Sequence, residues 1–318
     1  MRILFVGYRD ERHSKFGGYD YIAGYPNSTY LNACDVPFGF IPVGKKGKGI
    51  NLRFLYLKSM LMKSRFDVVH YFYGDFMLFG KLPEKKNTKF FTTIHMRSKD
   101  LSEKKLEILR QFDGVISLSS AEKNNLELLG VKAHFIPHGF NKPSYKKVEC
   151  AGFDDSRINI FYSGTNYRDF DMFLKTVEYC KSCKKNIHFY AVGQSAENKL
   201  KLAGYENVTV CKRLDDDEYY SLLNSCDYNF LPLTFATANN ALLESQAFGK
   251  ISILPDIDGI QDYADHNNNL LYKNFESLAK ILDGVRKEST CSDLMLFAQK
   301  FSWNEIYKRL EDVYSCGV

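Results

Sequence analysis

The sequence lacks the long apolar segments and the cysteine patterns that mark specialised classes of protein. No stretch approaches about 20 consecutive apolar residues, the length that a helix needs to cross a bilayer. The apolar residues after Met1 give way to polar ones at Gly7, too soon for a secretory signal, so the cytoplasm is the expected location. Among eight cysteines only Cys180 and Cys183 form a C-x-x-C pair, and no second pair accompanies it, which argues against a zinc site.

Several catalytic and binding motifs are also missing. Gly7 is followed by Tyr8-Arg9-Asp10 rather than by a G-x-G-x-x-G turn, which argues against a nicotinamide-dependent oxidoreductase. The acidic runs 154–155 and 215–217 are interpreted as solvated turns, so we expect no metal and no cofactor. The formal net charge is +5, but the basic residues are spread out without a recognition motif, which disfavours nucleic acid as a partner.

What remains is an ordinary globular composition with strands and helices in alternation. Hydrophobic residues make up 45% and charged residues 25% of a chain of 318, enough for two domains of about 150 residues. The alternation predicts an α/β fold with parallel sheets covered on both faces. About ten strands are too many for one open sheet, so we expect two Rossmann-like domains. The predicted strands are residues 2–7, 67–73, 89–95, 114–118, 133–137, 158–163, 187–192, 207–211, 228–233 and 250–254.

The domain boundary is expected in the polar stretch 141–157, which contains Pro143 and precedes an apolar strand. We place the N-terminal domain at residues 1–146 and the C-terminal domain at residues 147–318.

Residues 239–250 carry the clearest functional signal. They read N-N-A-L-L-E-S-Q-A-F-G-K between two predicted strands, which predicts a short loop, a helix and a glycine stop. Asn239 or Asn240 can cap this helix, and Gly249 can supply the left-handed turn that ends it. The first-turn N–H groups would form an anion site, with Glu244 about 6 Å further along the axis. A diphosphate on the helix end would therefore bring a ribose diol close to this carboxylate.

This segment is similar to the donor-binding motif of retaining GT-B glycosyltransferases of the family-4 type, which often reads E-G-x-P-N-A-L-L-E-A-M-A-C-G. Residues 240–244 match its N-A-L-L-E, and Ala247 and Gly249 match the A and G that follow. The resemblance implies that Glu244 binds the nucleotide ribose. It also implies that the donor diphosphate lies at the backbone of Asn239, Asn240, Ala241 and Leu242. The family usually carries a further Glu eight residues before the one that Glu244 matches. In this sequence that position is Ala236.

The resemblance has consequences for the architecture. It implies the GT-B arrangement, in which the parallel sheets of two Rossmann-like domains face each other across a cleft. The N-terminal domain would serve the acceptor and the C-terminal domain the nucleotide-sugar donor. The last helix, about 303–318, would pack back on the N-terminal domain.

A second resemblance follows the strand 158–163, where the chain reads S-G-T-N-Y-R-D-F-D. The family typically has G-R-x-x-x-x-K-G-x-D here, and both of its cations clamp the donor diphosphate. Arg168 takes the place of the Lys, and Thr165, next to Gly164, takes the place of the Arg. A guanidinium suits phosphate because it is planar and always charged. Alternatively, Arg168 is a surface charge beside a helix. Arg213 is interpreted as a further charge or a border of the base pocket, with a solvated surface position as the alternative.

Two features of the N-terminal half also match the family. The pair Gly17-Gly18 follows the first strand, where glycines let the backbone approach the donor phosphate and the acceptor. His95 ends a strand in T-x-H, at the edge where α/β sheets bind ligands, and in the family it faces the hydroxyls of the transferred sugar. The alternative for His95 is a histidine hydrogen-bonded within the domain. His70 is expected to be a satisfied sheet residue.

Residues 45–65 contain seven cations among apolar residues. One interpretation is peripheral contact with an anionic membrane surface, where such enzymes meet lipid-linked acceptors. The other is a domain helix whose apolar face is core and whose lysines are solvated.

The resemblance implies a retaining glycosyltransferase, and we expect it to be metal-independent because no Asp-x-Asp cluster of the metal-using kind stands near a plausible site. It would move a sugar from a nucleotide-diphosphate sugar to a glycan or lipid-linked acceptor, with Arg168 and His95 as catalytic residues. The leaving phosphate would take the acceptor's proton, so the enzyme would need no nucleophile of its own. The alternative is a non-catalytic GT-B-like subunit that supports a partner glycosyltransferase, suggested by Ala236 and Thr165. The sequence does not indicate which nucleotide, sugar or acceptor is used, nor the oligomeric state.

Overall fold

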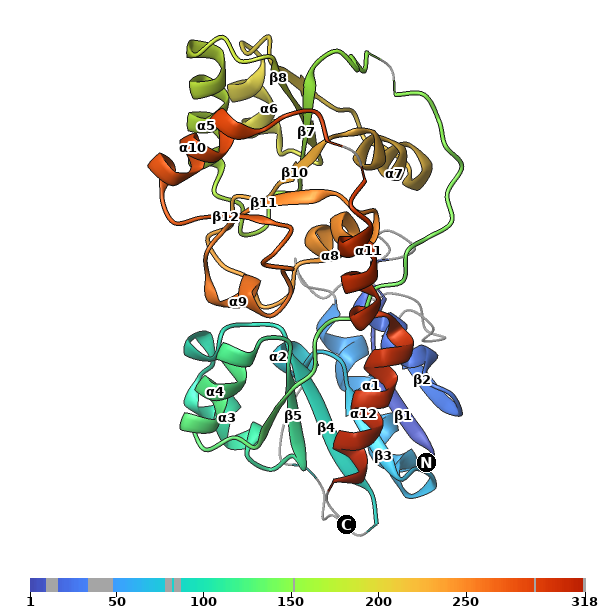
Figure 1. Cartoon of the computed structure of the whole chain (residues 1–318). Coiled ribbons are helices and arrows are strands. Elements are labelled where there is room, and N and C mark those ends of the chain that lie inside the picture. The colour runs from blue at the N-terminus through green and yellow to red at the C-terminus, as the bar shows by residue number, and fades with distance from the viewer. Residues whose placement is uncertain are drawn as a thin grey trace. The chain divides into compact units, whose positions relative to one another are not determined.

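The computed structural model describes residues 1–9, 17–33, 48–77, 82, 87–150, 152–288 and 290–316. The chain divides into two compact units, Met1–Gly139 with Phe301–Val318, and Phe140–Lys300. Each unit contains one six-stranded sheet. Figure 1 shows helices around each sheet. All strand pairs are parallel, so the predicted fold class of two parallel α/β sheets is confirmed.

The sheet of the first unit has the strand order β2-β1-β3-β4-β5-β6. Its strands are β1 (Ile3–Gly7), β2 (Ser28–Asn32), β3 (Val68–Tyr71), β4 (Lys89–Ile94), β5 (Gly114–Ser117) and β6 (Ala133–Phe135). Strands β1, β3 and β5 are buried at every residue, because a parallel sheet is covered on both faces. The order reverses at β1, with β2 on one side and β3 on the other.

The helices of the first unit include the C-terminal one. They are α1 (Lys48–Met62), α2 (Gly74–Met77), α3 (Glu103–Leu109), α4 (Ser120–Leu128) and α12 (Trp303–Ser315), with 3-10 turns at Tyr19–Gly24, Lys63–Arg65 and Ser98–Asp100. Helix α12 is fixed to the sheet by Tyr314, whose hydroxyl hydrogen-bonds His70 Nδ1 and whose carbonyl accepts from Lys89 Nζ at 2.8 Å. The second ring nitrogen of His70 meets Thr93 Oγ1 at 2.8 Å, so His70 is the satisfied sheet residue that was expected.

The sheet of the second unit has the strand order β12-β11-β10-β7-β8-β9. Its strands are β7 (Ile158–Ser163), β8 (Ile187–Val192), β9 (Val208–Val210), β10 (Tyr228–Phe230), β11 (Ile251–Pro255) and β12 (Leu270–Tyr272). The order reverses between β7 and β10, because β8 and β9 extend the sheet on one side and β11 and β12 on the other. Ligands of α/β sheets bind at the carboxyl ends of the strands at such a reversal.

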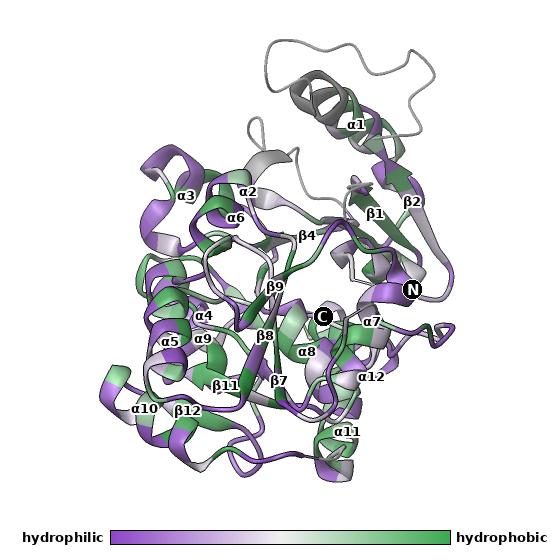
Figure 2. Cartoon of the chain, turned by 90° about the horizontal axis from the view of Figure 1, so that it is seen from above, coloured by the Kyte–Doolittle hydropathy of each residue, from purple (hydrophilic) through white to green (hydrophobic). Residues whose placement is uncertain are grey.

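Seven helices surround this second sheet within the described residues. They are α5 (Phe170–Ser182), α6 (Ala196–Leu202), α7 (Asp216–Ser225), α8 (Asn240–Ala247), α9 (Asp258–Gln261), α10 (Phe275–Gly284) and α11 (Ser292–Ala298). Figure 2 shows hydrophobic and hydrophilic residues alternating along α5, as expected for a helix with one face on the core. In the part of the chain that the structure describes, no helix is both long and apolar enough to cross a membrane.

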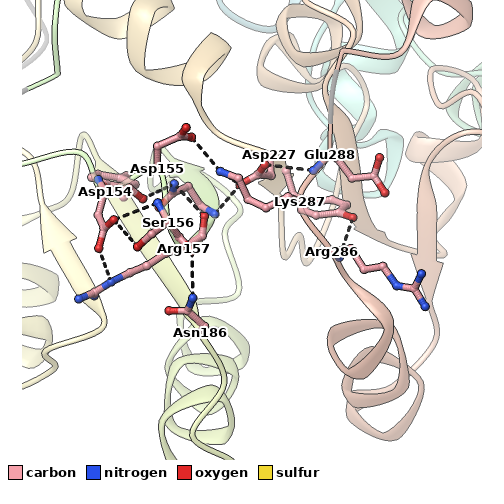
Figure 3. Close-up of polar contacts among 12 residues, drawn as sticks. Asp154, Asp155, Ser156, Arg157, Asn186, Asp227, Arg286, Lys287 and Glu288 are labelled. Atoms are coloured by element: carbon pink, nitrogen blue, oxygen red, sulfur yellow. Dashed lines mark hydrogen bonds and ion pairs between the residues drawn. The ribbon is translucent and has the colours of Figure 1, made fainter.

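The acidic pair Asp154–Asp155 belongs to a network at the amino ends of the strands of the second sheet (Figure 3). Asp227, just before β10, accepts from the backbone N–H of Asn159 at 2.7 Å and of Glu288 at 3.1 Å. Lys287 Nζ lies 2.9 Å from Asp155 and 3.3 Å from Asp227. The network ties the start of β7 and β10 to the segment after α10, at the end of the sheet away from the strands' carboxyl ends.

Candidate functional site

Helix α8 begins as the sequence predicts. Asn239 has an extended backbone, and its side-chain oxygen accepts from the backbone N–H of Leu242 at 3.1 Å. Gly249 follows the helix with φ +70°, and a Cβ there would lie 2.7 Å from the carbonyl oxygen of Cys291. The cap engages the amide of Leu242, whose side chain is fully buried. Leu242 is therefore a structural residue of the cap, and the first-turn amides that precede it belong to Asn240 and Ala241.

Helix α8 is buried along most of its length, from Leu242 to Ala247. Buried polar groups need partners, and two of them find partners inside the protein. Ser245 donates its hydroxyl to the carbonyl of Lys250 at 3.0 Å, and Gln246 donates to the carbonyl of Tyr263 at 2.9 Å. These bonds fix the helix on its inner side, so the position of its N-terminal end is set by the core.

Glu244 is the third buried polar residue of α8, and its side chain meets a residue that the sequence analysis did not consider. The Tyr219 hydroxyl, from α7, donates to Glu244 Oε2 at 2.8 Å. Glu244 is only 7% exposed, and burial raises the pKa of its carboxyl to about 7, although the Tyr219 hydrogen bond and the Arg168 charge both lower it. Burial also raises the pKa of Tyr219, which keeps its phenol neutral and able to donate.

Arg168 is half-buried in the loop after β7. Its Nε donates to the carbonyl of Ser163 at 2.9 Å, and Nη1 donates to the carbonyl of Asn166 at 3.2 Å. Burial lowers the pKa of the guanidinium, and the Glu244 carboxylate, whose charge raises it, acts in the opposite direction. Arg168 thus hydrogen-bonds the backbone of its own loop and places a half-buried positive charge within electrostatic reach of Glu244, which argues against the alternative of a solvated surface charge.

The loops after β7 and β10 lie side by side because these strands are neighbours, with Tyr228 opposite Ile160. Arg168 and Leu233 form an antiparallel bridge, and the Asp169 amide donates to the carbonyl of Pro232 at 2.8 Å. Gly164 has φ +78°, a left-handed conformation that favours glycine. The fold therefore brings Gly164, exposed Thr165 and Arg168 to the same edge of the sheet as the α8 N-terminus.

Arg213 is less well connected to this group. It is exposed and follows β9, the outermost strand, which is separated from β7 by β8. Two strand spacings correspond to about 10 Å. Its neighbour Lys212 pairs with Glu218 at 3.3 Å.

In the first unit, His95 lies just beyond β4 against a buried carboxylate. Asp75 accepts from the backbone N–H of His95 at 2.9 Å and of Met96 at 3.3 Å, and its Oδ2 lies 3.5 Å from His95 Nδ1. The rings of Tyr19 and Tyr73 lie 4.9 Å and 4.8 Å from the imidazole. Asp75 and the two tyrosines therefore hold His95 in one orientation. None of the three was among the residues selected from the sequence.

The pair Gly17-Gly18 is buried and leads into the 3-10 turn that carries Tyr19. Gly18 has φ −87°, so at this position the glycine is not needed for a left-handed conformation. Tyr19 donates to or accepts from Thr93 Oγ1 at 2.9 Å, which links this turn to β4 and to the surroundings of His95.

The acidic run 215–217, interpreted from the sequence as a solvated turn, begins helix α7, and the pair 154–155 takes part in ion pairs. Asp215 caps α7 in a capping box with Glu218, and Asp169 caps α5 by accepting from the Met172 amide at 2.9 Å. Within the described ranges, no group of three or more His, Cys, Asp or Glu side chains is arranged to hold a metal ion.

Comparisons with known proteins agree with this geometry. The family described as Glycosyltransferase Family 4 matches residues 19–142, and the family described as Glycosyl transferases group 1 matches residues 157–286. Anabaena HepE, solved with UDP and glucose, is 16% identical over 99% of both chains with a TM-score of 0.68. Sucrose-phosphate synthase of Thermosynechococcus elongatus is 17% identical over 98% of this chain and 88% of its own, with a TM-score of 0.67. A glycosyltransferase of Rickettsia africae is 15% identical over 98% and 97%, with a TM-score of 0.66.

A search of curated protein sequences gave no match. The two family matches together extend over most of the chain, one in each unit. The chain therefore belongs to the GT-B glycosyltransferases of the group 1 and family 4 type, which transfer a sugar from a nucleotide-sugar donor.

Proposed function

We propose that this chain is a retaining, metal-independent transferase that uses a UDP-sugar and delivers the sugar to a glycan or lipid-linked acceptor. The observation that carries the donor assignment is the N-terminus of α8, capped by Asn239 at 3.1 Å, with the buried Glu244 one turn further in. The helix end suits a diphosphate, and the carboxylate suits a ribose diol. HepE was solved with UDP and with UDP-glucose, and the pneumococcal O-GlcNAc transferase with UDP and GlcNAc, which supports uridine as the nucleoside of the donor.

The proposed chemistry is displacement on one face of the sugar. The bond from the anomeric carbon to the phosphate oxygen breaks, and a bond from that carbon to the acceptor oxygen forms. The amides of Asn240 and Ala241 and the charge of Arg168 stabilise the negative charge that grows on the diphosphate. A leaving phosphate oxygen takes the acceptor's proton. His95, held by Asp75, is proposed to contact the transferred sugar on the strength of its T-x-H resemblance.

The test is to incubate the purified chain with a panel of nucleotide sugars and candidate acceptors. Binding is read as a thermal shift, because a ligand at about 100 times its Kd stabilises the fold by about 2.7 kcal/mol. Transfer is read as UDP release, and the product's anomeric configuration by NMR. We expect a UDP-sugar to shift the transition, the product to keep the donor's configuration, and activity to persist in EDTA. UDP binding without transfer to any acceptor would favour the supporting subunit, and no response to any nucleotide would refute the proposal.

A membrane surface is proposed as a further partner, through α1. Residues 45–47 lie outside the described residues, and the described side chains of the helix begin at Phe54. Phe54, Leu57 and Leu61 are 43%, 63% and 85% exposed and recur at helical spacing, with Lys58 exposed among them. Large apolar residues beside a cation suit an anionic bilayer. The protein should co-sediment with phosphatidylglycerol vesicles, and Leu61→Ser should reduce the vesicle-bound fraction. Equal binding of both proteins would remove α1 from this role.

A further inference from the structure

An exposed aromatic residue projects from the loop after β7. Tyr167 is 53% exposed, although it lies between Asn166 and the half-buried Arg168. Its φ is +54°, a left-handed conformation that costs free energy for a residue with a Cβ. Asparagine or glycine would adopt the same backbone more easily. Strain of this kind persists where the surrounding structure enforces it, and such positions cluster at ligand sites.

The neighbouring loop after β10 supplies that enforcement. The Thr234 amide donates to the carbonyl of Tyr167 at 3.0 Å, and the Thr234 hydroxyl donates to the same oxygen at 3.3 Å. The ring of Phe235 packs edge-on against Tyr167, with 5.3 Å between centroids and 71° between planes. Tyr167 and Phe235 therefore form an aromatic pair on a fixed backbone, which we call the 167/235 pair.

The 167/235 pair lies at the edge of the sheet to which the donor diphosphate is assigned. It spans the carboxyl ends of β7 and β10, the two strands between which the sheet order reverses. Tyr167 is adjacent to Arg168, the proposed diphosphate cation. Phe235 is adjacent to Ala236, the position where the related family carries a Glu. The side of the diphosphate site that would bind the sugar thus has two aromatic rings and no carboxylate at 236.

We propose that the 167/235 pair is a stacking platform for the ring of the transferred sugar, which compensates for the missing Glu at position 236. The face of an aromatic side chain can stack on the C–H face of a pyranose. This contact does not depend on hydrogen bonds to the hydroxyl groups of the sugar. The site would then recognise the donor by the apolar face of its sugar more than by hydrogen bonds to its hydroxyls. This inference rests on the proposed use of a UDP-sugar.

The test compares UDP with UDP-glucose by calorimetry in the intact protein. UDP contacts the ribose and diphosphate sites, whereas UDP-glucose also contacts the platform. Tyr167→Asn removes the ring but accepts the left-handed backbone, Tyr167→Phe keeps the ring, and Phe235→Leu keeps the apolar volume. We expect Tyr167→Asn and Phe235→Leu to weaken UDP-glucose binding by about five- to tenfold. UDP affinity should be unchanged in all variants, and Tyr167→Phe should bind both ligands like the unmodified chain.

Three outcomes would overturn the platform. If Tyr167→Asn leaves UDP-glucose affinity unchanged, the ring does not contact the sugar. If UDP and UDP-glucose lose affinity equally, Tyr167 shapes the loop for the diphosphate. If the unmodified chain binds neither ligand, the proposed function fails and the platform fails with it, whereas the first two outcomes leave the proposed function intact.

Discussion

Because burial raises the pKa of Glu244, an experiment can distinguish whether its carboxyl group binds the nucleotide or only stabilises the fold. Glu244→Gln keeps the size of the side chain and its ability to accept from Tyr219, but it removes the titration. In the unmodified chain, the folded state holds the proton with a pKa of about 7, against an ordinary value of 4.5. The protonated form is therefore favoured by folding. Its contribution to stability is complete below about pH 4.5 and is lost as the pH rises towards 7.

The magnitude follows from the size of this shift. At 1.36 kcal/mol per unit, a difference of about 2.5 pKa units stabilises the folded state by about 3 kcal/mol at a pH below both pKa values. Between pH 5 and pH 8 the stability of the unmodified chain relative to Glu244→Gln should fall by about 2 to 3 kcal/mol. Loss of the charged contact with ribose should meanwhile weaken UDP binding at pH 8 by about ten- to a hundredfold.

Urea unfolding of both proteins at pH 5 and pH 8 measures the first quantity, and calorimetric titration with UDP measures the second. Glu276→Gln, on the exposed start of α10, is the matched control for replacing a glutamate by glutamine outside the site. A stability difference that stays constant between the two pH values would refute the buried, protonated carboxyl. Loss of stability at both pH values together with unchanged UDP affinity would make Glu244 a structural residue.

Three further predictions concern the residues around these sites. Arg168→Ala should lower turnover by at least about tenfold, because it removes a charge that stabilises the leaving diphosphate, and unchanged turnover would exclude it from the mechanism. Asp75→Asn should lower kcat by about ten- to a hundredfold, because it frees the His95 side chain to turn. UDP affinity should be unchanged, because the proposed UDP site lies in the second unit; an equal effect on kcat and on UDP affinity would contradict a positioning role. Tyr219→Phe removes a hydrogen bond that lowers the pKa of Glu244, so the pH midpoint of UDP binding should move upward, and a midpoint that stays in place or falls would refute the pairing.

Most of the fold could be predicted from the sequence, because apolar strands in a parallel sheet are recognisable by themselves. All ten predicted strands are present, from β1 to β11. The two that were missed are β2 and β12, at the outer edge of each sheet. Strand β2 is only partly buried and reads S-T-Y-L-N, so it carries no apolar run.

The candidate site was predictable only where its geometry is local. The Asn239 cap spans three residues and the Gly249 turn follows directly from glycine, so both were visible in the sequence. The contact between Tyr219 and Glu244 joins α7 to α8 across 25 residues, and that between Asp75 and His95 joins α2 to the residue after β4 across 20. Such pairs depend on how the helices pack, which no spacing rule encodes.

A crystal structure with UDP would show directly whether the N-terminus of α8 binds the donor diphosphate. We expect the diphosphate at the amides of Asn240 and Ala241, and the ribose hydroxyls within hydrogen-bonding distance of the Glu244 carboxylate. UDP bound elsewhere on the chain, with the α8 N-terminus unoccupied, would contradict the assignment of the donor site to this helix.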